Sequence, residues 1–97
     1  MRELTYDREQ LAALCRAYHI KRLAVFGSVL RDEDTPASDL DLLVEFEGPK
    51  TPGLRFFRLE RELSALFGHK VDLNTRGFLS PYFRDEVAAT AYPIYAS

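Results

Sequence analysis

The chain has 97 residues, 46% of them hydrophobic and 29% charged, with a formal net charge of −2. This length and ordinary composition exclude a disordered chain and predict a single domain over residues 1–97 with one modest core. The acidic balance argues against a protein whose affinity rests on neutralising the many phosphates of a nucleic acid. We therefore expect nucleic acid not to be a direct partner.

The chain shows no sign of a membrane or secretory location. Its apolar runs fall short of the roughly 20 residues that a membrane span needs, and its start lacks the basic and apolar pattern of a signal peptide. The single cysteine, Cys15, excludes an internal disulfide framework and lies at a core spacing, so we expect a buried, inert thiol. These features predict a cytoplasmic protein with no membrane partner.

The first half of the chain predicts one helix and two strands. Apolar residues at helical spacing after the capping-box-like start at Asp7 predict a helix over about 7–18. A continuous apolar run predicts a buried strand from Ile20 to Gly27, with a brief helical turn after Ser28. From Asp39 to Phe46 apolar and polar residues alternate, which is the pattern of a strand with two different faces.

The second half predicts two more helices and one or two short strands. An amphipathic helix ends at Gly68, and its mixed-sign run over residues 55–62 predicts a solvated face partly paired at i, i+4. Residues 70–75 predict a strand. Ser80-Pro81 predicts the N-cap and first position of a last helix, and residues 92–95 a terminal edge strand, where proline is tolerated.

This order of elements predicts the fold class. Helices alternate with short strands, which indicates an α/β (α+β) fold: a small mixed β-sheet with helices packed on one face. The helix between the second and third strands is long enough for a parallel crossover, although the pattern alone leaves the strand direction open.

Three carboxylates are candidates for a catalytic metal site. Asp39 and Asp41 lie two residues apart on one predicted strand and so share a face, and Asp72 lies opposite its apolar neighbours on another. If the strands are neighbours, the three acids meet on one surface. Clustered carboxylates repel one another unless a cation lies among them, and one Mg²⁺ ion or a pair of them suits such oxygen ligands. The alternative is a set of solvated acids on the wet face of a sheet.

A second candidate feature is the turn after the first strand. Gly27 allows backbone amides to approach a phosphate, Ser28 offers a hydroxyl, and a following helical turn adds its positive end. Arg31 is placed to contact a triphosphate. Taken alone, Gly27-Ser28 also fits a plain turn, and Arg31 fits a surface arginine.

These two features together resemble a known family. Gly27-Ser28, ten intervening residues, and then Asp39-Leu40-Asp41 is similar to the signature of the DNA polymerase β-like nucleotidyltransferases, with their palm-like fold. The stretch resembles the minimal branch of that superfamily, which supplies the antitoxin of toxin–antitoxin pairs whose toxin is a HEPN-domain ribonuclease. The resemblance extends from about Leu11 to Ala91, and Lys70 to Leu73 is similar to the strand of the third carboxylate.

The resemblance implies roles for these residues. Gly27 and Ser28 would bind the triphosphate of ATP, with Arg31 as a further phosphate contact. Asp39 and Asp41 would bind Mg²⁺, and Asp72 would complete the cluster and help to deprotonate the acceptor. The family reaction moves AMP from ATP onto a tyrosine of the HEPN toxin and so neutralises it.

Two other functions remain open at this point. A surplus of aromatic residues would also suit an antitoxin that neutralises its toxin by binding alone, and these residues are Phe57, Tyr82, Tyr92 and Tyr95. Nucleotidyl transfer to a small molecule or an RNA end is the other alternative.

Overall fold

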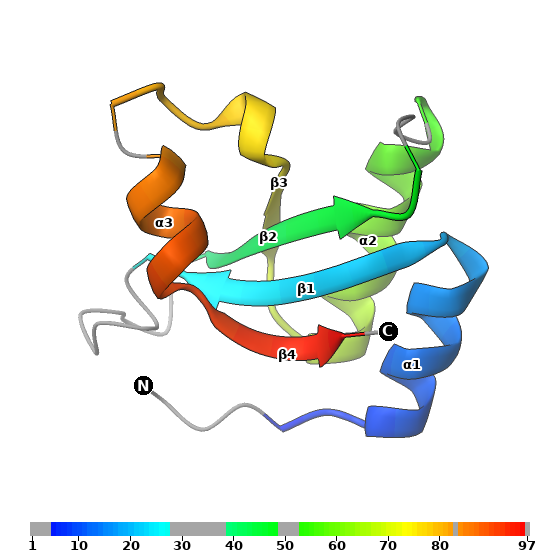
Figure 1. The fold of residues 1–97 in the computed structure, drawn as a ribbon. Helices are drawn as coiled ribbons and strands as arrows, with labels where there is room; N and C mark the ends of the chain where they lie inside the picture. Colours follow the sequence, from blue (N-terminus) through cyan, green and yellow to red (C-terminus); the bar gives the residue numbers. More distant parts are fainter. Residues whose placement is uncertain (1–4, 28–38, 49–52, 83, 97) are drawn as a thin grey trace.

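The structure is a computed structural model that describes residues 5–27, 39–48, 53–82 and 84–96. Three α-helices, one 3₁₀ turn and four strands alternate along this part of the chain (Figure 1). No helix in these ranges is both long and apolar enough to cross a bilayer. In chain order the elements are α1 (Arg8–Ala17), β1 (Ile20–Phe26), β2 (Leu40–Phe46), α2 (Arg55–Phe67), β3 (Val71–Asn74), η1 (Arg76–Phe78), α3 (Arg84–Thr90) and β4 (Tyr92–Ala96).

The first two helices have the ends that the sequence predicts. Asp7 caps α1, because its Oδ1 accepts hydrogen bonds from the backbone N–H of Glu9 at 2.9 Å and of Gln10 at 3.1 Å. Gly68 ends α2 in the left-handed conformation with φ 64°, which glycine adopts without steric cost. Both predicted helices are therefore confirmed to within two residues.

The four strands form one mixed sheet in the order β3-β2-β1-β4. β1 runs antiparallel to both β2 and β4, whereas β2 and β3 are parallel and are joined through α2. The sequence left this direction open, and the structure resolves it as the parallel crossover. The expected terminal strand is also confirmed, as β4 at the edge beside β1.

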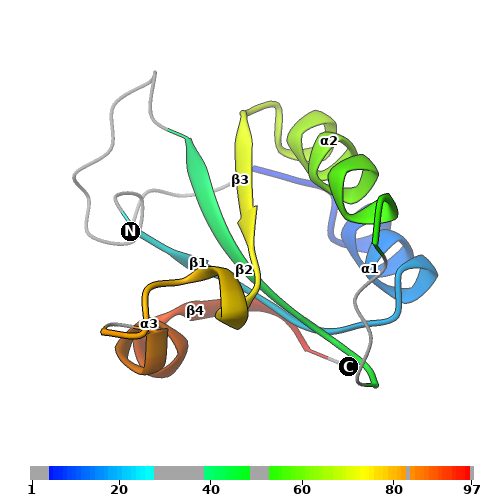
Figure 2. The ribbon, with the colours of Figure 1, turned by 90° about the horizontal axis from the view of Figure 1, so that it is seen from above.

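One face of the sheet packs against α1 and α2 (Figure 2). Leu59 and Leu63 of α2 are fully buried there, and so is Cys15 of α1. Burial raises the pKa of the Cys15 thiol to about 12, which confirms the expected inert cysteine. The strands contribute Leu23, Val25, Leu40, Leu42, Val44, Val71 and Leu73 to this core.

The helix α3 lies on the other side of the sheet from α1 and α2 (Figure 2). The guanidinium of Arg22 in β1 donates to the backbone oxygens of Ala88 and Ala91, each at 3.5 Å. The expected fold class is thus confirmed, with two helices on one face and a short third helix as an addition on the other.

The start of the last helix differs in part from the prediction. Ser80 behaves as a cap, since its Oγ accepts from the N–H of Tyr82 at 3.3 Å and its carbonyl accepts from the N–H of Arg84 at 3.0 Å. The residues directly after Ser80 form a turn, however, and α3 has its regular bounds at Arg84–Thr90. Pro81 is therefore in the turn rather than at the first position of α3.

Candidate active site

The parallel pairing of β2 and β3 brings two of the predicted acids side by side. Asp41 is the register partner of Asp72 across these strands, and neighbouring strands are only about 4.8 Å apart. Each acid lies between two buried residues of the α1/α2 core, so both side chains are on the opposite face of the sheet. The pleat and the register together therefore place two carboxylates next to each other on the face of the sheet away from α1 and α2.

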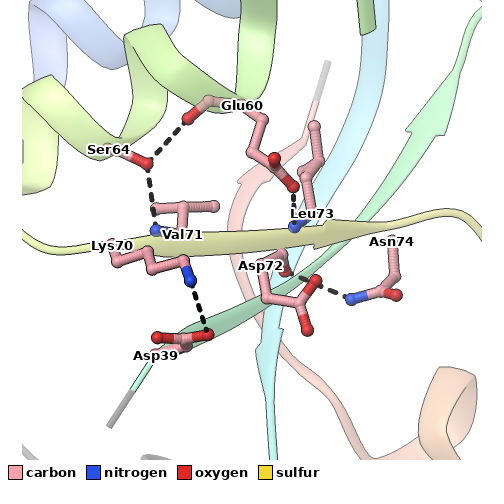
Figure 3. Close-up of polar contacts among 8 residues, drawn as sticks. All are labelled: Asp39, Glu60, Ser64, Lys70, Val71, Asp72, Leu73 and Asn74. Atoms are coloured by element: carbon pink, nitrogen blue, oxygen red, sulfur yellow. Dashed lines mark hydrogen bonds and ion pairs between the residues drawn. The ribbon is translucent and has the colours of Figure 1, made fainter. Parts of the chain in front are cut away.

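The third acid, Asp39, lies at the start of β2 and contacts a residue that sequence reasoning missed. Its Oδ2 is 3.9 Å from Nζ of Lys70, and both side chains are well exposed (Figure 3). The backbone N–H of Leu40 donates to the carbonyl of Lys70 at 2.8 Å, which holds the two chain segments together. Lys70 therefore places a positive charge at the edge of the acidic surface. Only the parallel register reveals this neighbour, and the sequence alone left that register open.

Gly27 is packed directly against Asp41. It follows β1, whose last residue, Phe26, is the register partner of Asp41, and it has a φ of +79°. A Cβ added at Gly27 would overlap Oδ2 of Asp41 and would come within 3.0 Å of its Cγ and 3.2 Å of its Cβ. Position 27 thus needs glycine for two reasons: a left-handed backbone and the close approach of a carboxylate.

The other two predicted phosphate contacts, Ser28 and Arg31, lie outside the described residues, as does the expected helical turn after Ser28. Their roles stay predictions.

Two side chains of α2 accept hydrogen bonds from the backbone of β3, at the residues directly before and after Asp72. The N–H of Val71 donates to Oγ of Ser64 at 2.9 Å, and the N–H of Leu73 donates to Oε2 of Glu60 at 2.9 Å (Figure 3). The prediction of a solvated helix face is therefore wrong for Glu60, because its carboxylate is used within the fold. The predicted i, i+4 pairing is confirmed at Arg58 and Glu62, whose N···O distance is 3.6 Å.

The carboxylate oxygens of Asp41 and Asp72 are suitable ligands for a hard divalent cation. Mg²⁺ is commonly bound by one or two carboxylates and completes its shell with water and phosphate oxygens, which neighbouring Asp41 and Asp72 would allow. Within the described ranges, no three His, Cys, Asp or Glu side chains are gathered closely enough to enclose a metal ion by themselves. Asp39 as a further ligand therefore stays a prediction, and its contact in this structure is Lys70.

Comparison with known proteins places the chain in a family. The nucleotidyltransferase domain family matches residues 7–90, and the chain belongs to this family. It is a nucleotidyltransferase, and the predicted resemblance is confirmed. A protein of Methanocaldococcus jannaschii named as a candidate protein adenylyltransferase is 44% identical over 82 residues, covering 82% of each chain.

Solved structures agree with this assignment. A structure described as a candidate minimal nucleotidyltransferase has 41% sequence identity and a TM-score of 0.73, with 90% of this chain and 88% of that chain covered. The tri-AMPylated HEPN toxin of Shewanella oneidensis in complex with its MNT antitoxin gives a TM-score of 0.61 at 17% identity, over 93% of this chain and 70% of that chain. The second likeness shows the shared fold.

Proposed function

We propose that this nucleotidyltransferase is an antitoxin that transfers AMP from ATP, with Mg²⁺, to a tyrosine of a HEPN-type ribonuclease toxin and thereby neutralises it. The observation that carries the proposal is the pair of adjacent carboxylates, Asp41 and Asp72, with Gly27 packed against the first of them. The relative at 44% identity supports a protein as the acceptor. The AMPylated toxin bound to an antitoxin of the same fold supports a HEPN partner.

In the proposed reaction, one group of residues binds the triphosphate and another binds the metal. Gly27, at the end of β1, would let backbone N–H groups approach the triphosphate, with Ser28 and Arg31 as further contacts. Asp39 and Asp41, with Asp72, would hold Mg²⁺, which when bound offsets the charge that develops on the transferred phosphate and on pyrophosphate.

Asp72 also takes part in the proton transfer. The acceptor hydroxyl oxygen bonds to the α-phosphorus, the bond from that phosphorus to pyrophosphate breaks, and the hydroxyl proton passes to the Asp72 carboxylate. Asp72 is exposed, so an acceptor held by a separate protein can reach it. Lys70, beside Asp39, supplies a positive charge near the path of the anionic substrate.

The test uses α-labelled ATP, Mg²⁺ and a lysate of the source cells. The wild type should label one protein band, and the double variant Asp39→Asn/Asp41→Asn should label none. Glu45→Gln is a matched control, because Glu45 lies on β2 four residues beyond Asp41 and outside the proposed site. Equal labelling by the double variant would refute the catalytic role of the two acids. Label on RNA or a small metabolite instead of protein would refute the protein acceptor.

A second candidate function is neutralisation of the toxin by binding alone. Large apolar side chains are exposed on two parts of the surface: Leu54 and Phe57 at the start of α2, and Tyr82 and Tyr92 near α3 and β4. Such side chains often serve as anchors in interfaces. Tyr95 differs from the expected set, since it is partly buried against the core. A double variant at Asp39 and Asp41 that still protects cells from the toxin would favour this function.

A further inference from the structure

We infer that Glu60 and Ser64 are positioning residues for Asp72: together they hold the strand that carries this carboxylate in place from the opposite face of the sheet. The inference rests on the proposed function, because it takes Asp72 as part of the reacting site. The observation behind it is a pair of hydrogen bonds from α2 to the residues on either side of Asp72 (Figure 3).

The first step is the position of β3 in the sheet. It is a strand of four residues at the edge of the described sheet, and its partner among the described strands is β2. In a parallel pair, the backbone groups of alternate residues face the partner strand. Asp72 therefore faces β2 with its backbone, and the N–H groups of Val71 and Leu73 face away from it. In the structure both groups find their acceptor on α2.

The second step is the match between helix and strand. Glu60 and Ser64 are four residues apart on α2, a rise of about 6 Å along the helix. Val71 and Leu73 are two residues apart on β3, a distance of about 6.6 Å. The two spacings agree, so both N–H groups reach an acceptor at 2.9 Å.

The third step is how firmly the acceptors are held. The hydroxyl of Ser64 donates a hydrogen bond to the carbonyl of Glu60 at 2.8 Å. The lone pairs of Ser64 Oγ are therefore available to accept from the N–H of Val71. Both Glu60 and Ser64 are half-buried. The height and tilt of β3 beside β2 are thus set by α2, and with them the distance from Asp72 to Asp41.

The experiment compares three variants of α2. Glu60→Leu removes the acceptor of Leu73, Glu60→Gln keeps an oxygen at the same place, and Glu62→Leu makes the same change at a glutamate that pairs with Arg58 instead of β3. Amide hydrogen exchange, followed by NMR, first establishes that the Leu73 N–H loses protection in Glu60→Leu only.

Two readouts then separate positioning from stability. Loss of such supporting contacts commonly lowers metal affinity or activity by about 10- to 100-fold. In Glu60→Leu we expect kcat for label transfer to fall by about tenfold, while the KM for ATP stays within about twofold of wild type. We also expect Mn²⁺ to bind about tenfold more weakly, as measured by the broadening of the Asp72 amide signal. Glu60→Gln and Glu62→Leu should remain within about threefold of wild type in both, at an equal folded fraction.

The outcomes distinguish this inference from the proposed function. Equal kcat and equal Mn²⁺ affinity in Glu60→Leu and Glu60→Gln would overturn the positioning role, even if the wild type transfers AMP to protein. If the wild type labels no protein, the proposed function fails, and the Mn²⁺ comparison still decides the role of Glu60. An equal loss of both properties in Glu62→Leu would also overturn the inference, because the effect would then come from α2 as a whole.

Discussion

Gly27→Ala is the most direct test of the geometry around Asp41. The alanine would have to keep a φ near +79°, which costs a residue with a side chain about 1–2 kcal/mol. Its Cβ would also overlap the Asp41 carboxylate, whose Cγ and Cβ would be only 3.0 and 3.2 Å away. The whole short side chain of Asp41 must therefore turn away from its present position.

The control is Gly48→Ala. Gly48 has nearly the same backbone, with a φ of +80°, but among the described residues beyond its chain neighbours no atom lies within 4 Å of an added Cβ. Urea unfolding should show a loss of about 1–2 kcal/mol in both variants, because both pay the same backbone cost.

The activities of the two variants should differ sharply. Displacement of a reacting group by about 1 Å can cost about 100-fold in rate, so kcat/KM for AMP transfer should fall by about that factor in Gly27→Ala. Gly48→Ala should stay within about threefold of wild type, since its change does not reach the acids. If Gly27→Ala loses no more activity than Gly48→Ala at an equal folded fraction, the close approach of Gly27 to Asp41 has no part in the reaction and the reasoning is refuted.

Three further predictions concern stability. Leu59→Ala should lower the free energy of unfolding by about 2–5 kcal/mol in urea, because Leu59 is fully buried under the sheet, and a loss below about 1 kcal/mol would contradict that packing. In the folded protein the pKa of Cys15 is about 12, above the ordinary 9.0, so the thiol of the unfolded chain loses its proton first as the pH rises. The contribution of this thiol to the free energy of unfolding should therefore be fully present below about pH 9. It should fall by about 1.4 kcal/mol per pH unit as the pH rises toward 12. Cys15→Val should remove that part of the alkaline loss, and an unchanged pH profile would count against it. Lys70→Gln should change the unfolding free energy by less than about 1 kcal/mol in thermal melts, because its pair with Asp39 is exposed, whereas a larger loss would show a stronger contact.

The helix ends and the two faces of β2 were predictable from the sequence because they depend only on residues close together in the chain. The cap at Asp7 and the left-handed end at Gly68 follow from neighbouring residues alone. The alternation along β2 separates Asp41 from the core residues on either side of it. That pattern was enough to predict that the Asp41 side chain lies on the face away from the core before the neighbouring strand was known.

The remaining features depend on contacts between distant segments, and local patterns do not encode them. Glu60 has the spacing of an ordinary helix surface, and its partner, the N–H of Leu73, is 13 residues further along the chain. Lys70 meets Asp39 only because β2 and β3 are parallel and in one particular register. From the sequence, we predicted that Gly27 lets backbone amides approach a phosphate. The structure adds a second reason for a glycine, because the Asp41 carboxylate occupies the space that a side chain at position 27 would need.

The two edge strands of the described sheet are chemically unequal. At β3, side chains of α2 already accept the outward N–H groups of Val71 and Leu73. At the other edge of the described sheet, β4 pairs with β1, and Pro93 removes one N–H donor from this strand. Strand addition between copies of a sheet uses unpaired N–H and C=O groups at an edge, and continued growth needs two such edges. The hydrogen bonds that hold Asp72 in place thus also leave the β3 edge with two fewer unpaired N–H groups for strand addition.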